Sequence, residues 1–212
     1  MEPHGTGPVL TAGAALDDAD AAMIMIHGRG AGPRDILSLV PALERPSVAY
    51  VAPGAVGGTW YPNSFMAPRA SNEPGISSGL AVIESLVTDL MLRGFPEEKI
   101  LLLGFSQGAC LASEFVIRHP RRYGGLLVLS GGLIGEPGTE WDDVTATFDG
   151  MAVFLGCSDV DSHIPKGRVI ETETVLTRLG ARVTWTLYPG MGHLVNEDEI
   201  AEVQRIIDET VA

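Results

Sequence analysis

The sequence predicts an α/β fold with a mostly parallel, twisted sheet and helices on both of its faces. Short apolar runs alternate with helix-like segments along most of the 212 residues, and each run is continuously apolar. Such runs are typical of strands that helices cover on both sides, and parallel strands need a crossover, usually a helix, between them. No repeat, low-complexity tract or linker interrupts this order, so we expect one domain over 1–212, with residues 1–20 partly irregular.

Six runs are predicted as buried strands, because each is short, apolar and bounded by turn or polar residues. They are 21–26 (AAMIMI), 47–52 (SVAYVA), 99–105 (KILLLGF), 125–130 (GLLVLS), 151–156 (MAVFLG) and 182–188 (RVTWTLY). Four stretches between or after them are predicted as helices: 78–93, 106–118, 166–179 and 197–211. The first helix places Leu80, Ile83 and Val87 on one face at three- and four-residue spacing.

Two long irregular segments, 53–76 and 131–150, each follow a predicted strand. Loops of this length in a compact domain are often functional, and ligand sites of parallel sheets lie beyond the carboxyl ends of the strands. Both segments are therefore predicted as walls of a site.

Composition narrows the class of protein. With 45% hydrophobic and 19% charged residues the chain is compact, and its net charge of −13 disfavours nucleic acid and anionic membranes as partners. The first 20 residues lack a signal-peptide pattern, and no apolar stretch approaches the roughly 20 residues that span a membrane. We expect a cytoplasmic protein without stable membrane association, whose Cys110 and Cys157 are free thiols. The sequence leaves open whether the protein forms a homodimer.

The pattern G-x-S-x-G occurs twice, as GISSG at 75–79 and GFSQG at 104–108. A nucleophile elbow needs a strand running into the first glycine and a helix starting at the serine. Only GFSQG has that context, because KILLL precedes it and ACLASEFVIR follows it. Ser106 is therefore the candidate nucleophile, whereas Ser77 or Ser78 is predicted to cap a helix that begins near residue 79.

A serine hydroxyl becomes nucleophilic when a base takes its proton and an acid orients that base. Among the five histidines, His4 lies in the N-terminal segment, His27 closes a strand, His119 ends a helix, and His163 lies in SHIP. His193 lies in a glycine-rich loop between the last strand and the last helix, where a triad histidine is expected. It is the candidate base.

Five motifs now resemble one family. HGRGAG at 27–32, TWYPNSFMAP at 59–68, GFSQGA at 104–109, GCSDVDSHIP at 156–165 and YPGMGH at 188–193 are similar to those of the phospholipase/carboxylesterase family. This family of α/β-hydrolases also contains the acyl-protein thioesterases, and the resemblance covers roughly residues 20–210. It implies an α/β-hydrolase fold and a serine hydrolase of esters or thioesters, with Ser106 as nucleophile, His193 as base and an aspartate near 159 as acid.

Two ways of counting residues in the loop after the 151–156 strand select different aspartates as the acid that orients His193. The family's aspartate comes three residues after the strand end, which selects Asp159 when Gly156 ends the strand. Its Asp-x-x-x-Pro spacing, counted back from Pro165, selects Asp161. We predict Asp159, with Asp161 as the alternative, because a strand end is the more rigid reference.

The oxyanion hole requires two N–H donors. One is predicted as the backbone amide of Gln107, the residue after the nucleophile, and the other as an amide within HGRGAG, which the resemblance to the family places at Arg29. Most relatives have an apolar residue where this chain has Arg29. Its side chain is expected either to attract a carboxylate or phosphate of the substrate, or to lie exposed without a role. Four large side chains of the 59–68 motif are predicted to line a substrate pocket or, alternatively, to anchor the loop on the core; they are Trp60, Tyr61, Phe65 and Met66.

No metal or cofactor is expected. Asp159, Asp161 and His163 lie close together in sequence, but the glycine and closing glutamate of a calcium loop are missing. The predicted function is a serine carboxylesterase that hydrolyses small to medium esters through an acyl-enzyme, because the short chain leaves no room for a separate lid domain. The alternatives are an acyl thioesterase, a lysophospholipase-like hydrolase, and a non-catalytic small-molecule receptor on the same fold.

Overall fold

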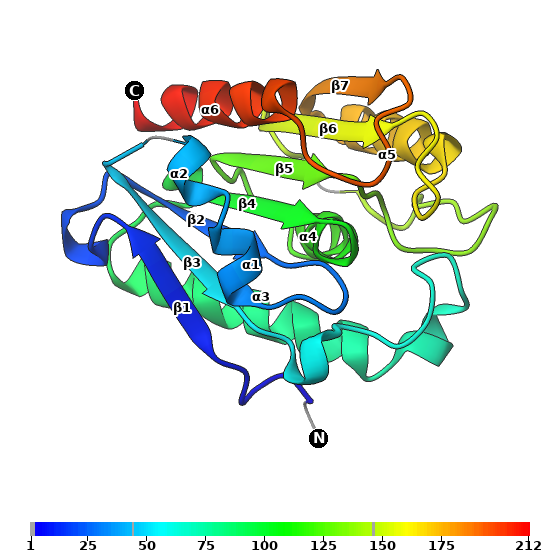
Figure 1. Cartoon of the computed structure of the whole chain (residues 1–212), viewed down its shortest axis with the longest axis horizontal. Helices are drawn as coiled ribbons and strands as arrows, with labels where there is room; N and C mark the ends of the chain where they lie inside the picture. The colour runs from blue at the N-terminus through cyan, green and yellow to red at the C-terminus, as the bar shows by residue number, and fades with distance from the viewer. Residues whose placement is uncertain (1–2, 44, 146) are drawn as a thin grey trace.

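A computed structural model describes residues 3–43, 45–145 and 147–212. Its centre is a seven-stranded sheet in the order β1-β3-β2-β4-β5-β6-β7 (Figure 1). The strands are β1 (Val9–Gly13), β2 (Ala21–Ile26), β3 (Val48–Pro53), β4 (Ile100–Phe105), β5 (Gly125–Leu129), β6 (Ala152–Ser158) and β7 (Arg182–Tyr188). All six predicted strands are present, and the predicted fold class is confirmed.

The sheet is parallel except at one edge. β1 pairs antiparallel with β3, with Val9 opposite Pro53, and every other pair of neighbours is parallel. The sequence did not predict β1. Its side chains alternate between exposed and half-buried, and a five-residue edge strand buries too little to leave a clear apolar run. Because β2 to β7 are all parallel, the turns after β2, β4, β6 and β7 meet at the same end of the sheet.

Helices cover both faces. They are α1 (Pro33–Leu37), α2 (Val40–Leu43), α3 (Gly75–Leu92), α4 (Gln107–Arg118), α5 (Lys166–Arg178) and α6 (Glu197–Val211). α3, α4 and α5 pack on the face that carries Ile24 and Leu102, whereas α1, α2 and α6 pack on the face that carries Met23 and Leu101. Each central strand therefore buries alternate side chains in two separate clusters, which explains its continuously apolar sequence.

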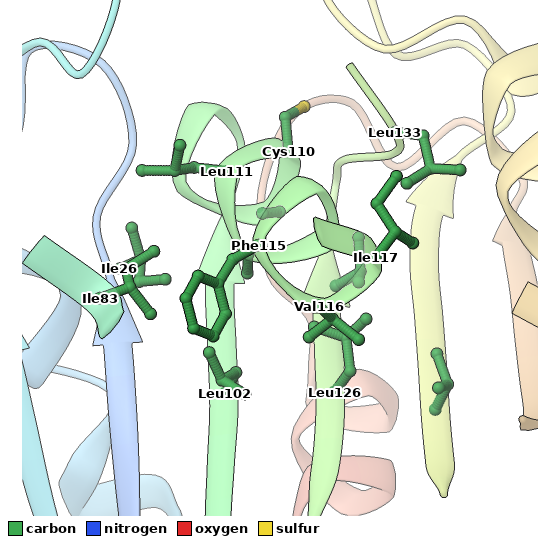
Figure 2. Close-up of a cluster of buried hydrophobic side chains, with 14 of the residues drawn as sticks. Ile26, Ile83, Leu102, Cys110, Leu111, Phe115, Val116, Ile117, Leu126 and Leu133 are labelled. Carbon is green, nitrogen blue, oxygen red and sulfur yellow. The ribbon is translucent and has the colours of Figure 1, made fainter. Parts of the chain in front are cut away.

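The central helix α4 lies directly over β4 and β5. Figure 2 shows Phe115 and Val116 pointing from α4 toward Leu102 and Leu126, and all four side chains are fully buried. Burying a side chain of this size contributes about 1.5–3 kcal/mol. This packing holds α4 on the sheet, and the first residue of the helix, Gln107, follows directly after Ser106.

α3 begins earlier than predicted, at Gly75 rather than near residue 79, so Ser77 and Ser78 lie inside its first turn. The prediction that one of them caps the helix is wrong. The Glu73 carboxylate accepts a hydrogen bond from Ser77 N (3.0 Å) and supplies that contact instead. Among the described helices α3 is also long and apolar enough to cross a membrane, although Ile83 and Val87 are buried in the core.

The N-terminal segment combines turns with β1 and contacts the rest of the fold. His4 is only 4% exposed, its Nε2 lies 2.8 Å from Trp60 O, and its backbone N donates to Ser78 Oγ at 2.9 Å. The segment that leads into β1 is therefore attached to both the 59–68 loop and the start of α3.

Candidate active site

Ser106 occupies the turn between β4 and α4 with φ 55° and ψ −119°. A non-glycine residue with this backbone is strained, at a cost of about 1–3 kcal/mol, and such residues concentrate at functional sites. Two glycines make the turn possible. A Cβ on Gly104 would lie 2.4 Å from the backbone carbon of Gly108, and a Cβ on Gly108 would lie 2.1 Å from Ile26 O. The serine hydroxyl is thus held at the carboxyl end of β4, as the G-x-S-x-G context predicts.

Three side chains from distant parts of the chain form one hydrogen-bonded line. The Ser106 hydroxyl lies 2.8 Å from His193 Nε2, and His193 Nδ1 lies 2.7 Å from Asp161 Oδ2. A carboxylate only accepts hydrogen bonds, so Nδ1 carries the proton and Nε2 is left to accept from the hydroxyl. The arrangement has the geometry of a serine nucleophile, its base and the acid that orients the base.

Asp161 is held in its charged form. Its side chain is completely buried, and burial raises the pKa of this carboxyl. The hydrogen bond from His193 and those from the backbone amides of His163 (2.8 Å) and Ile164 (3.0 Å) outweigh that effect, so the pKa lies below its usual range. A carboxylate that is ionised and fixed by four contacts can both orient His193 and stabilise its protonated form.

The fourth contact of the Asp161 carboxylate is with the thiol of Cys157. Cys157 Sγ lies 3.8 Å from Asp161 Oδ2, and burial, together with the charge of Asp161, raises the pKa of the thiol to about 12. The thiol is therefore protonated and can donate a weak hydrogen bond to the same oxygen that faces His193.

The prediction that Asp159 faces His193 is wrong. Asp159 is exposed, and its Oδ1 accepts a hydrogen bond from Gly190 N at 2.8 Å, so it fixes the loop that leads to His193. The strand-end count failed because β6 continues to Ser158, two residues beyond Gly156. The pairing with β7 even extends to a hydrogen bond from Asp159 N to Tyr188 O. Counting back from Pro165 selects Asp161 correctly.

The two residues whose amides are predicted to form the oxyanion hole come from separate parts of the fold. Gln107 is the first residue of α4, and Arg29 lies in the loop after β2; both residues border the same cavity as Ser106. Within the part of the chain that the structure describes, neither amide donates a hydrogen bond to another protein group. A Cβ on Gly28 would lie 3.3 Å from Ser106 Cβ, so the glycine lets the loop pass close to the nucleophile.

The loop that carries Arg29 is itself fixed by His27. Its Nδ1 lies 2.8 Å from Gly28 O and its Nε2 accepts from Ala55 N at 3.0 Å. Burial lowers the pKa of His27, which favours the neutral ring whose Nε2 can accept from Ala55 N. The sequence identified His27 only as the end of a strand, and its supporting role depends on partners that no local pattern reveals.

The side chains of Gln107 and Arg29 both hold the 59–68 loop. Gln107 Oε1 accepts from Trp60 N at 2.9 Å, and Gln107 Nε2 donates to Tyr61 O at 2.8 Å. The Arg29 guanidinium donates to Pro62 O at 2.9 Å and to Asn63 O at 2.7 Å. The two residues predicted to offer the oxyanion amides thus also position one wall of the cavity.

Next to Ser106 and His193 lies a cavity of about 600 Å³. It is bordered by Gly28, Arg29, Ala31, Tyr61, Pro62, Asn63, Ser64, Phe65, Phe105, Ser106, Gln107, Cys110, His163, Ile164 and His193. Of the four side chains predicted as a pocket, the structure brings Tyr61 and Phe65 to this cavity. Trp60 is fully buried and donates its Nε1–H to His27 O at 3.0 Å, and Met66 packs against the core. Both residues anchor the 59–68 loop on the core, which was the alternative prediction. The prediction that they line the pocket is wrong.

The segment 131–150 does not border the cavity in the described part of the chain, although it was predicted as a wall. Arg168 holds it against α5 by donating to Leu133 O at 2.7 Å and Gly135 O at 2.9 Å. Gly135 N in turn donates to Phe65 O at 3.0 Å. The segment therefore supports the wall that carries Phe65 from behind.

His163 is a residue of the site that the sequence did not assign. Its ring lies edge-on to that of His193, with the ring centroids 4.7 Å apart, and it borders the cavity. It comes to this position because the loop turns sharply around Asp161, whose Oδ1 receives the His163 amide.

Comparisons with known proteins agree with this geometry. The profile of the phospholipase/carboxylesterase family matches residues 13–211. The crystal structure of a phospholipase/carboxylesterase from Dyadobacter fermentans superposes with a TM-score of 0.92 at 38% identity, covering 98% of both chains. Acyl-protein thioesterase 1 of Eremothecium gossypii is 26% identical over 227 residues, which covers 96% of this chain and 94% of that protein.

A probable carboxylesterase of rice is 26% identical over 156 residues; the match covers 71% of this chain and spans only 58% of that relative's length. Family profile, fold and motifs agree, and the chain belongs to the phospholipase/carboxylesterase family of α/β-hydrolases.

Proposed function

We propose that this protein is a cofactor-free serine carboxylesterase that hydrolyses small to medium carboxylic esters through an acyl-enzyme intermediate. The observation that carries the proposal is the hydrogen-bonded line from Ser106 through His193 to the buried Asp161. Membership of a family of ester and thioester hydrolases supports the same class of reaction.

In the first half-reaction Ser106 Oγ attacks the carbonyl carbon of the ester while its proton moves to His193 Nε2. The carbonyl oxygen becomes an oxyanion, for which the amides of Arg29 and Gln107 are the available donors. The intermediate then collapses: the bond to the alcohol oxygen breaks, that oxygen takes the proton from Nε2, and the acyl group stays on Ser106.

In the second half-reaction water attacks the acyl carbon and gives a proton to His193 Nε2. When the bond to Ser106 Oγ breaks, that oxygen takes the proton back, and the free acid leaves. Throughout both steps Asp161 keeps the proton on Nδ1 and stabilises the imidazolium. Apart from the ester and water, the groups that this cycle uses are side chains and amides of the chain itself.

The volume of the cavity supports a small to medium substrate. A volume of about 600 Å³ lies within the range of about 300–1,000 Å³ that is typical of small-molecule sites. The apolar rings of Tyr61 and Phe65 border it, which suits an acyl chain or an alcohol of a few carbons. The net charge of −13 and the two free thiols support a cytoplasmic enzyme without nucleic-acid or membrane partners.

A thioesterase is the second candidate, because relatives named acyl-protein thioesterase match this chain and the same three side chains can cleave both bonds. The test is a fluorophosphonate label followed by a panel of esters and thioesters with matched acyl groups. We expect labelling of Ser106 and a larger kcat/KM for the oxygen esters. Larger kcat/KM values for thioesters would favour the second candidate, whereas no labelling and no turnover would contradict both and favour the non-catalytic alternative.

A further inference from the structure

Arg29 is exposed and brings a positive charge to the cavity. It is the only Lys, Arg, Asp or Glu among the described residues that border the cavity. It also forms no ion pair in the described structure, although the chain carries 27 acidic residues. Arginines elsewhere do pair, as Arg45 does with Asp208, Arg118 with Asp143 and the buried Arg168 with Glu171.

The guanidinium is also fixed in position. Two of its N–H groups donate to Pro62 O and Asn63 O, and its carbon lies 5.9 Å from the centroid of the Tyr61 ring. A guanidinium has five N–H donors, so three remain for a ligand. Carbonyl oxygens hold the group but do not cancel its charge. A fixed guanidinium of this kind suits an oxyanion, and a carboxylate in particular, because the planar fork matches its two oxygens.

We propose that Arg29 determines specificity and that the preferred substrates are esters that carry a second, free carboxylate. This inference rests on the proposed function, since it names the substrate class of the same site. The anionic group would lie at the Arg29 side of the cavity while the ester carbonyl lies at Ser106. Asn63, whose carbonyl accepts from the Arg29 guanidinium, and the next residue, Ser64, also border the cavity and are polar.

Because the protein has a net charge of −13, we expect Arg29 to select small anionic esters and not anionic ligands in general. The protein surface repels anions on average, and this repulsion is screened by salt beyond about 10 Å. A small ester with one carboxylate gains the direct contact with Arg29, whereas a large anionic surface such as a vesicle cannot enter the cavity. The predicted ligand is therefore a small dicarboxylic monoester or a short ester of a hydroxy acid.

The experiment compares three esters with wild-type protein and two variants. Phenyl butyrate is neutral, monophenyl succinate carries a carboxylate on an acyl chain of the same length, and 4-carboxyphenyl butyrate carries it on the alcohol. Arg29→Gln removes the charge. Arg34→Gln is the matched control, because Arg34 is exposed in α1 and does not border the cavity.

For wild-type protein we expect a larger kcat/KM for one of the two anionic esters than for phenyl butyrate, and the preferred ester tells which side of the bond faces Arg29. Arg29→Gln should lower the ratio of anionic to neutral kcat/KM about tenfold or more, as a lost charge-assisted hydrogen bond does, and Arg34→Gln should leave it unchanged. Added NaCl should raise the KM of the anionic ester in wild-type protein and not in Arg29→Gln.

Two results would overturn the inference: no preference for either anionic ester in wild-type protein, or an equal loss for all three esters in Arg29→Gln. The second result would mean that Arg29 only holds the 59–68 loop.

Binding to Ser106→Ala, measured by calorimetry with the same three esters, separates this inference from the proposed function. If the wild-type protein hydrolyses none of the esters, the proposed function fails. Tighter binding of an anionic ester, lost in Ser106→Ala/Arg29→Gln, would still uphold the inference, and equal binding of all three would overturn it.

Discussion

His193 Nδ1 lies 2.7 Å from Asp161 Oδ2, while Asp159, only two residues earlier, accepts its hydrogen bond from Gly190 N. Both carboxylates belong to the same loop after β6, yet one accepts from the proposed base, His193, and the other holds the backbone of the loop that carries His193. This division of roles gives the first test of the site.

Asp161→Asn should lose most of the esterase activity, by roughly 10⁴ in kcat, because the neutral amide no longer stabilises the imidazolium or fixes its tautomer. Asp159→Asn keeps an oxygen that can accept from Gly190 N and should lose far less. Kinetics with phenyl butyrate and thermal unfolding of both variants check this. A dead Asp159→Asn beside an active Asp161→Asn would reverse the assignment.

Ser106→Ala should abolish hydrolysis, on the order of 10⁶ in kcat, because no other group takes the place of the attacking oxygen. Ser77→Ala is the matched control: it alters the second G-x-S-x-G pattern, which the structure places in the first turn of α3. Its activity should stay near that of the wild type. Comparable losses in the two variants would show that Ser106 has no special role.

Gly108→Ala should destabilise the protein and remove activity, although alanine is the better helix former. The added Cβ would lie 2.1 Å from Ile26 O, and backbone on both sides cannot yield without moving the elbow. The expected loss in unfolding free energy is about 1–3 kcal/mol, as for other overpacked sites. Gly167→Ala in α5 is the control, because nothing lies within 4 Å of its Cβ, and it should be neutral or slightly stabilising. Urea unfolding that ranks the two variants in the opposite order would contradict this.

The buried Glu199 should make the free energy of unfolding depend on pH. Its side chain is fully buried in the first turn of α6, one carboxylate oxygen accepts from Asn196 N, and the other has no partner in the described structure. Burial raises the pKa of Glu199 to about 7, above the value of roughly 4.3 in an unfolded chain. Between these values the folded state binds more protons, so the contribution of Glu199 to stability is full below about pH 4.3 and is lost as the pH rises to about 7.

Glu199→Gln should remove this slope, since an amide does not titrate and can still accept from Asn196 N. The measurement is the unfolding free energy of both proteins in urea at several pH values between 5 and 8. The variant should gain stability relative to the wild type as the pH rises. A constant difference between the two proteins would contradict the raised pKa.

Much of the fold could be predicted from the sequence because buried parallel strands are continuously apolar. β2 (Ala21–Ile26) and β7 (Arg182–Tyr188) begin and end where predicted. β1 could not be predicted, since a short edge strand carries no such run. The start of α3 was misplaced because Gly75 and Pro74 read as a turn, whereas the Glu73 side chain, which no spacing rule reveals, supports a helix from Gly75 onward.

The candidate site was predictable where local geometry constrains the sequence, and not elsewhere. The elbow at Ser106 requires glycines at 104 and 108, so its signal is local. The choice between Asp159 and Asp161 depends on how far β6 pairs with β7, which is a long-range property of the sheet. The 59–68 loop shows the same limit, because Trp60 and Tyr61 are adjacent aromatic residues but only Tyr61 borders the cavity.

The most direct test of the central proposal is to trap the acyl-enzyme. Wild-type protein is mixed with 4-nitrophenyl butyrate, quenched in acid within the first turnover, and digested for mass spectrometry. We predict one butyryl group per chain on the peptide that contains Ser106, a burst of nitrophenol that matches it, and neither in Ser106→Ala. Steady turnover without any adduct, or an adduct on another residue, would contradict the proposal.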